Sequence, residues 1–327
     1  MTTDVLTARG VPADLTPQVD VRRVGPDVGT VGVALASAAA FSTSGSFATA
    51  LLRAGWSPAA AVTARIGLAA LVLAGPTVWT LRGRWDLVRR KALPILLYGL
   101  TGVAGCQLAY FYAVQRLSVG VALMLEYLSP VLLVLGFWLW TRRRPAAATI
   151  AGTLVCIGGL ALVLDVFGGA HLSFVGVLWG LGAAVCSAAY FVIAGNADDD
   201  LPPLPLAGVG MAVGAAALGL LGIVGVLPMH ATTSDTTFAR HQVPFWIPLI
   251  ALAVIATAFA YFAGVVAARG LGQTIASFVA LAEVLFSVLF AWLLLGQLPL
   301  AIQLLGGVCI VGGVVLVRLG ELRRTTP

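Results

Sequence analysis

Ten apolar stretches, separated by short polar segments, fill most of the chain. Each is close to the ~20 residues that a helix needs to cross the ~30 Å hydrocarbon core of a bilayer. None alternates apolar and polar residues in steps of two, as barrel strands do, so only helices satisfy the backbone N–H and C=O groups within lipid. The predicted helices are 30–52, 59–82, 92–115, 119–141, 146–165, 173–195, 204–228, 244–267, 272–295 and 300–318.

The second half of this pattern repeats the first. Segment 118–163 reappears as segment 272–317 at a constant offset of 154 residues, which matches Trp138 with Trp292. Because each copy holds five helices, an odd number, the second copy crosses the membrane in the opposite sense. The predicted fold is therefore an all-α polytopic membrane protein with ten transmembrane helices in a 5+5 inverted repeat. In secondary transporters such repeats meet at a substrate site near the midplane.

The same pattern divides the chain into four segments. Residues 1–28 are polar and contain three prolines, so we expect a disordered cytoplasmic tail. The two repeats are expected at 29–168 and 169–318, and 319–327 is expected to be a second cytoplasmic tail. Among the connections, only residues 230–243 are long enough for a structured loop.

Composition excludes a water-soluble class. Hydrophobic residues make up 60% of the 327-residue chain and charged residues only 10%, against about 25% charged in soluble proteins. The apolar excess must therefore face a lipid bilayer. The net charge of +6 does not predict a nucleic-acid partner, because the basic residues lie at the ends of the apolar stretches. The four cysteines lie inside those stretches without CxxC spacing, so buried free thiols are expected.

The basic residues also predict orientation, because Lys and Arg accumulate on the cytoplasmic side. With a cytoplasmic N-terminus, fifteen Lys and Arg residues lie inside and three outside, and Arg65 lies within the membrane. We therefore expect a multi-pass protein of the plasma (cytoplasmic) membrane with both termini in the cytoplasm.

Three residues well inside the apolar stretches carry formal charge: Arg65, Glu126 and Glu283. A charge within a span costs a few kcal/mol, so each needs a partner or water and marks a candidate site. At 1.5 Å per residue, Arg65 and Glu126 lie about 10 Å below the outer ends of their helices, and Glu283 lies about 16 Å above the inner end of its own. All three are predicted to meet in one layer.

We expect Arg65 to pair with one of the two carboxylates, leaving the other able to take up and release protons. The alternative is that Arg65 extends outward to the headgroups while Glu126 and Glu283 only lock helices together.

Uncharged polar side chains share this layer. A cluster of serines in the first helix could loosen the helix and bind a polar substrate, or it could serve ordinary small-residue packing. The two candidate tyrosines are of a type that more often packs than binds. These candidates are Ser42, Ser44, Ser46, Gln107, Tyr110 and Tyr127.

Pro130 is a candidate hinge, because it removes the backbone hydrogen bond to the Glu126 carbonyl and favours a kink. Its counterpart in the second repeat is Val284, and Glu283 matches Ser129 rather than Glu126. A symmetric carboxylate pair is therefore not expected.

Glycines at helical spacing predict close helix packing. Examples are Gly99 in the third helix, Gly210 in the seventh, and Gly152 and Gly306 in the last helix of each repeat. Enzyme signatures such as HExxH, GxSxG and the phosphate-binding GxxxxGK[ST] are absent. We therefore expect neither an enzyme nor a metal or other cofactor.

Together these features resemble the EamA-type ten-helix exporters of the drug/metabolite transporter superfamily over residues 30–318. The resemblance rests on the repeat, on Arg65, on Glu126–Pro130 and on Leu281–Glu283. A weaker similarity, over Phe111–Pro130, is to the threonine/homoserine exporter branch. Many members end their fourth and ninth helices with Gly-Glu, whereas this chain has Arg142-Arg143 and Gly296-Gln297 there, so no coupling role can be transferred to those positions.

The resemblance implies export of small amphipathic metabolites, amino acids above all, by alternating access with proton coupling. Helices 1–4 and 6–9 would line the substrate cavity, and no cofactor would be needed. Three alternatives stay open: a uniporter or exchanger of the same fold, an importer, and a membrane scaffold or enzyme that transports nothing. The expected partners are a small-molecule substrate, protons and the lipid bilayer, and either a monomer or a homodimer is compatible with the sequence.

Overall fold

The computed structural model describes residues 28–129, 131–132, 136, 147–163, 173–195, 202–264, 266–267, 279 and 281–325. Within this part of the chain nearly every element is a helix, and the one sheet is a two-stranded hairpin. Five helices are long and apolar enough to cross a membrane, and four shorter apolar helices accompany them. Large apolar side chains such as Leu71, Trp79 and Ile223 lie exposed on the outside, as a lipid-facing surface requires.

The helices begin and end close to the predicted limits. Those of the first repeat are α1 (Val28–Ser42), α2 (Ser44–Arg53), α3 (Pro58–Thr80), α4 (Trp85–Arg90), α5 (Ala92–Leu97), η1 (Tyr98–Gly105), α6 (Cys106–Val114), α7 (Val119–Glu126) and α9 (Ala147–Val163).

The second repeat follows the same plan. Its elements are α10 (Phe174–Gly195), α11 (Pro203–Ile223), β1 (Thr236–Phe238), β2 (His241–Val243), α12 (Trp246–Ala253), η2 (Val254–Phe259), α14 (Ala282–Leu295) and α15 (Ala301–Thr325). The last helix continues to Thr325, through most of the predicted C-terminal tail. The predicted hinge at Pro130 and the predicted N-terminal tail up to residue 27 lie outside the described residues.

Local sequence explains several helix ends. Before α3, the Ser57 hydroxyl accepts a hydrogen bond from the Ala60 N–H at 3.2 Å, and Pro58 takes the first helical position, where its missing N–H costs nothing. After α14, Gly296 adopts the left-handed conformation at φ +69°, which glycine reaches without strain.

The first membrane span is interrupted at its centre, as the serine cluster predicted. Helix α1 ends at Ser42 and α2 begins at Ser44, with Thr43 between them. The hydroxyls of Ser42 and Thr43 donate 2.6 Å hydrogen bonds to the carbonyls of Ala39 and Ala40. Such bonds compete with the helical ladder and bend the chain.

Both repeats contain a π-helical segment at the same place. At the 154-residue offset, η2 corresponds to the last six residues of η1. In η2 the Thr257 hydroxyl donates to the Leu252 carbonyl, five residues earlier, at 2.8 Å. Segments of this kind are rare and occur frequently at functional sites.

The two repeats interlock rather than lie beside each other. Helix α10, which opens the second repeat, packs against η1, α6 and α7 of the first. Helix α1, which opens the first repeat, packs against η2 and α14 of the second. We call η1, α6, α7 and α10 the first bundle. We call α1, α2, η2, α12 and α14 the second bundle, because α2 continues the span of α1 and packs against α12 and α14.

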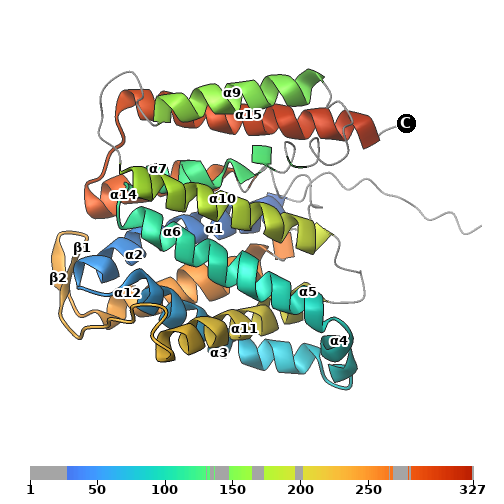
Figure 1. Cartoon of the computed structure of the whole chain (residues 1–327), viewed down its shortest axis with the longest axis vertical. Helices are drawn as coiled ribbons and strands as arrows, with labels where there is room; N and C mark the ends of the chain where they lie inside the picture. Colours follow the sequence, from blue (N-terminus) through green and yellow to red (C-terminus); the bar gives the residue numbers. More distant parts are fainter. Residues whose placement is uncertain are drawn as a thin grey trace, which may run out of the picture.

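The last helices of the two repeats, α9 and α15, pair at one edge of the molecule (Figure 1). A Cβ on Gly152 would lie 2.5 Å from the Gly313 carbonyl oxygen, and one on Gly159 would lie 2.7 Å from that of Gly306. The pair is therefore antiparallel. Gly152 matches Gly306 and Gly159 matches Gly313 in the repeat, so the contact is unchanged when the halves are exchanged. This is the twofold relation that an inverted repeat predicts.

The connection between α11 and α12 forms the β1–β2 hairpin and folds over the junction of α2 and α3. The Trp56 indole N–H donates to the Thr232 carbonyl at 2.8 Å, and the hydroxyls of Thr232 and Thr236 donate to the carbonyls of Ala54 and Ala50 at 2.6 Å. In Figure 1 this hairpin lies at the opposite end of the helices from α4 and the C-terminus.

Candidate functional site

Arg65 is the centre of the polar site. It lies on α3, it is only 1% exposed, and its guanidinium donates four hydrogen bonds. Nε donates to the Thr257 hydroxyl at 2.7 Å, and Nη2 donates to the Ala256 carbonyl at 3.1 Å. Nη1 donates to the Ser44 hydroxyl at 2.8 Å and to the Gln107 side-chain oxygen at 2.6 Å. Three helices besides its own thus hold this side chain in one orientation.

The predicted ion pair between Arg65 and a carboxylate is wrong. Among the described residues the salt bridge found is Arg90–Asp86, on the exposed helix α4. Neutral oxygens accept four of the five guanidinium N–H groups. The alternative, an Arg65 side chain extended outward to the headgroups, is equally wrong, because the side chain is buried among helices.

The two intramembrane carboxyls also have neutral partners. The Cys106 thiol donates to Glu126 Oε1 at 3.3 Å, within the first bundle. The Tyr127 hydroxyl donates to Glu283 Oε2 at 2.9 Å, from the first bundle to the second. Among the residues that the structure describes, neither carboxyl therefore has an ion-pair partner, and each keeps acceptor sites for another ligand.

One small cavity, lined by the buried Arg65 and the half-buried Glu126 and Glu283, brings the three ionisable side chains together. It measures about 30 Å³, which is room for about one or two water molecules and far below the ~300 Å³ at which sites for small organic ligands begin. The site is therefore closed in this structure. The residues that line it are Phe41, Ser42, Ser44, Arg65, Gln107, Tyr110, Leu123, Glu126 and Glu283.

Seven of the sequence-predicted site residues line this cavity, and two of those that the structure describes, Tyr127 and Ser46, do not. Tyr127 reaches the site only through its hydrogen bond to Glu283. Ser46 does not line it: this side chain is fully buried and its hydroxyl has no hydrogen-bond partner. The regular spacing of the serines gave a wrong prediction for Ser46. Ser42 and Ser44 lie on either side of the break at Thr43, whereas Ser46 lies further along α2 on another face of the helix. Pro130 lies outside the described residues.

Sequence reasoning missed three groups. Thr257 and the Ala256 carbonyl come from the π-helical segment η2, and Cys106 touches Glu126. The sequence signal that could have identified Thr257 is a polar residue within an apolar helix. No sequence signal distinguishes Cys106 from an inert buried thiol.

The site bridges the two bundles. Arg65 donates hydrogen bonds to Ser44 and Thr257 of the second bundle and to Gln107 of the first. A further hydrogen bond joins Tyr127 of the first bundle to Glu283 of the second. The lining residues come from the predicted helices 1, 2, 3, 4 and 9, and none of them belongs to α10, α11, α12 or η2. The expected contribution of helices 6–8 to the cavity wall is therefore not seen in the described residues. One cation and two carboxyls facing the same closed space can bind a small molecule that carries both charges. In the described residues no three His, Cys, Asp or Glu side chains gather to hold a metal ion.

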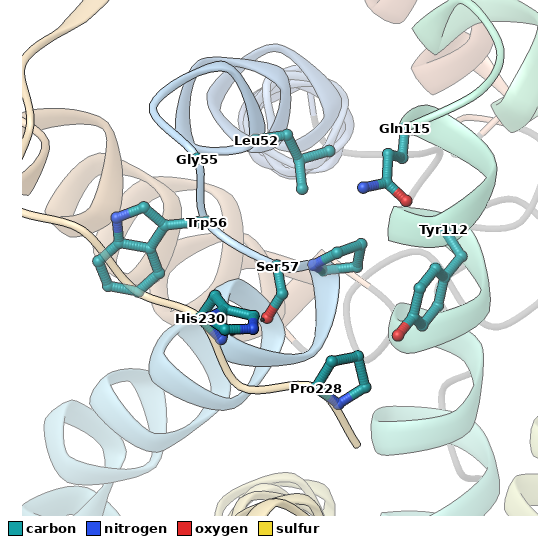
Figure 2. Close-up of a pocket in the computed structure, with 9 residues that line it drawn as sticks. Leu52, Gly55, Trp56, Ser57, Tyr112, Gln115, Pro228 and His230 are labelled. Atoms are coloured by element: carbon teal, nitrogen blue, oxygen red, sulfur yellow. Dashed lines mark hydrogen bonds between the residues drawn. The ribbon is translucent and has the colours of Figure 1, made fainter. Parts of the chain in front are cut away.

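A second, larger pocket opens at the end of the molecule that carries the hairpin (Figure 2). Its volume is about 390 Å³. It contains none of the intramembrane charged residues. Its lining residues are Leu52, Gly55, Trp56, Ser57, Pro58, Tyr112, Gln115, Pro228 and His230.

Comparison with known proteins agrees with this architecture. The sequence model of the EamA-like transporter family matches the chain twice, over residues 29–165 and 174–319. The chain belongs to this family. Members of the EamA-like family that it resembles are membrane transporters and not enzymes, so this all-α polytopic protein is a multi-pass membrane transporter of small molecules.

Two curated relatives are informative. An uncharacterized inner membrane transporter, YicL of Salmonella typhimurium, is 28% identical over 72% of this chain and 76% of its own length. The threonine/homoserine exporter RhtA of the same species is 26% identical over 60% of each chain. One solved crystal structure superposes with a TM-score of 0.55 at 22% identity, covering 91% of this chain and 99% of that one. This last likeness concerns the fold alone.

Proposed function

We propose that this EamA-like transporter exports small amphipathic metabolites, amino acids above all, by proton-coupled alternating access. The observation that carries the proposal is the meeting of Arg65, Glu126 and Glu283 in one closed cavity between the bundles, with none of them neutralised by another. Intramembrane charges are costly, and side chains that keep them without an ion pair are expected to serve a ligand or a proton.

The geometry favours a zwitterion. A guanidinium has five N–H donors, and four of those of Arg65 are used, so one Nη2 N–H is available for a substrate carboxylate. Glu126 and Glu283 offer acceptors for an ammonium group. The naming of one relative as a threonine/homoserine exporter agrees with this substrate class.

Proton coupling is supported by the partners of the two carboxyls. Because Cys106 and Tyr127 are neutral donors, either carboxyl can gain or lose a proton without breaking an ion pair. Protons entering from the outside would then release the ammonium group and drive the substrate outward.

Alternating access follows from the interlocked bundles. Opening the closed cavity to one side requires the bundles to tilt, and this breaks the Arg65–Gln107 and Tyr127–Glu283 hydrogen bonds. A bound substrate offsets that loss by its own contacts with the same groups. Segments 29–168 and 169–318 stay our assignment of the two repeats, with both termini in the cytoplasm.

The test is transport of L-threonine by purified protein in liposomes, with and without a pH gradient. We expect an acidic outer side to accelerate export, and Glu126→Gln or Glu283→Gln to remove that acceleration. Asp86→Asn, on the exposed helix α4, is the matched control and should change nothing. Transport that ignores the gradient in the wild type would instead identify a uniporter or exchanger.

A further inference from the structure

We call the larger pocket of Figure 2 the outer pocket, and the cavity that contains Arg65, Glu126 and Glu283 the central cavity. The same three helices line both spaces. On α2, Ser44 lines the cavity and Leu52 lines the pocket. Along α6, Gln107 lines the cavity, and Gln115, the residue that follows the last residue of the helix, lines the pocket. Eight helical residues separate each pair, which corresponds to about 12 Å. On α3, Arg65 lines the cavity and Pro58 lines the pocket, so all three helices pass from one space to the other.

Between the two spaces each of these helices contributes one apolar side chain. Ala48 on α2 and Val62 on α3 lie three or four residues from the lining of both spaces. Phe111 on α6 lies between Tyr110, which lines the cavity, and Tyr112, which lines the pocket. Ala48, Val62 and Phe111 are all 0% exposed. The guanidinium carbon of Arg65 lies 5.6 Å from the centre of the Phe111 ring. We call Ala48, Val62 and Phe111 the septum, because they separate the polar cavity from the pocket.

The pocket has the size and lining of a site for a small amphipathic molecule. Its 390 Å³ falls within the ~300–1,000 Å³ of small-ligand sites, which combine apolar walls with a few polar groups. Figure 2 shows the Tyr112 ring and the Gln115 amide on one wall, with the Trp56 and His230 side chains on the other. The lining contains no acidic residue, and the available polar groups suit a molecule with both a donor and an acceptor.

The wall formed by the hairpin connection is fixed to the α2–α3 junction. The Ser57 N–H donates to the His230 carbonyl at 2.8 Å, and the His230 N–H donates to the Ser57 hydroxyl at 3.0 Å. This wall of the pocket is therefore held to α2 and α3, whereas Tyr112 and Phe111 belong to α6 of the first bundle and Gln115 caps the C-terminus of α6.

We propose that the outer pocket is an exit vestibule that binds an amphipathic amino acid on its way out, and that the septum is the outer gate, closed in this structure. Ala48 and Phe111 belong to helices on opposite sides of the bundle interface, so a tilt of the bundles separates them and joins the two spaces. The vestibule's ligand class rests on the proposed function, but the gate does not.

The gate is tested by the accessibility of a buried thiol. Ser42→Cys places a reporter in the central cavity, where the Ser42 hydroxyl bonds only its own helix; the four native cysteines are replaced by serine or alanine. A charged, membrane-impermeant methanethiosulfonate is added from the outer side. We expect Phe111→Ala to raise the labelling rate about tenfold or more, because it removes side-chain packing that only the closed state has.

Phe47→Ala is the matched control. Phe47 is also a buried phenylalanine of the outer half, but it packs on Phe238 and lines neither space. Its labelling rate should stay at the parent level. If Phe111→Ala does not fold, Phe111→Leu and Val62→Ala should give a smaller rise in labelling. Unchanged labelling in the folded septum variants, or an equal rise in the Phe47→Ala control, would contradict the proposed gate. This outcome does not depend on which substrate the protein transports.

The vestibule is tested by protection. Gln115→Cys places an exposed thiol in the pocket, and L-leucine or L-threonine should slow its labelling. Protection should persist with Arg65→Ala, which disables the central site, and should be lost with Tyr112→Ala. Protection that disappears with Arg65→Ala would show that only the central site binds the amino acid, and it would overturn the vestibule while leaving the proposed function standing.

Discussion

The two places where the repeats meet are built on opposite principles. The α9–α15 pair is symmetric: its glycines contact each other's backbone, and each contact has its equal in the other half. The polar cavity is asymmetric. At the same offset of 154 residues, Gln107 matches Tyr261 and Thr257 matches Val103, so the groups that hold Arg65 have no copies. Symmetry was kept where the two repeats pack through glycines, and it was lost around the charged side chains of the cavity.

The largest effect is expected from the asymmetric region. Arg65→Met should abolish transport, because it removes the cavity's cation. It also leaves the half-buried Gln107 and the buried Thr257 without their donor, at about 1–3 kcal/mol for a buried unsatisfied group. Export of radiolabelled L-threonine and thermal unfolding would measure both losses. Arg90→Met, at an exposed position on α4, should leave both unchanged. Normal transport by Arg65→Met would contradict the site.

The symmetric region should respond in stability rather than in chemistry. Gly159→Ala places a methyl group 2.7 Å from the Gly306 carbonyl oxygen, and such overpacking costs about 1–3 kcal/mol. The neighbouring Gly158 has no atom within 4 Å of the same position, so Gly158→Ala should be neutral or stabilising by about 0.5–1 kcal/mol. Thermal unfolding of the two variants compares them directly, and equal midpoints would refute the close packing.

A third pair of variants separates contacts across the bundles from contacts within one. Tyr127→Phe removes the hydrogen bond to Glu283 between the bundles, which should favour opening by about tenfold if that bond contributes about 1.4 kcal/mol to the closed state. Labelling of Ser42→Cys measures this opening. Ser187→Ala removes the hydrogen bond from Ser187 of α10 to Ser129, within the first bundle, and leaves the Tyr127–Glu283 bond in place, so its opening equilibrium should stay at the parent level.

The smallest effect is expected at Ser46. Its buried hydroxyl has no hydrogen-bond partner, so Ser46→Ala should keep full transport and slightly raise stability, because removing an unsatisfied polar group relieves its desolvation cost. Ser44→Ala, two residues away, removes a partner of Arg65 and should lower transport. A transport loss with Ser46→Ala equal to that with Ser44→Ala would return Ser46 to the site.

The sequence by itself determined the class of the fold and the layer of the site. The apolar stretches required helices because lipid offers the backbone no other partner, and the odd number of helices in each copy required an inverted repeat. The positions of Arg65, Glu126 and Glu283 along their helices were enough to place them at one depth, because the rise per residue is fixed.

Only the tertiary structure decided which side chains meet. Depth along a helix is local, but rotation and tilt depend on packing against neighbouring helices, so the sequence could not show that Thr257 and Gln107, rather than a carboxylate, surround Arg65. The partners of Glu126 and Glu283 and the septum above Arg65 were likewise hidden. Each is a contact between residues far apart in the chain, and helical periodicity carries no information about such contacts.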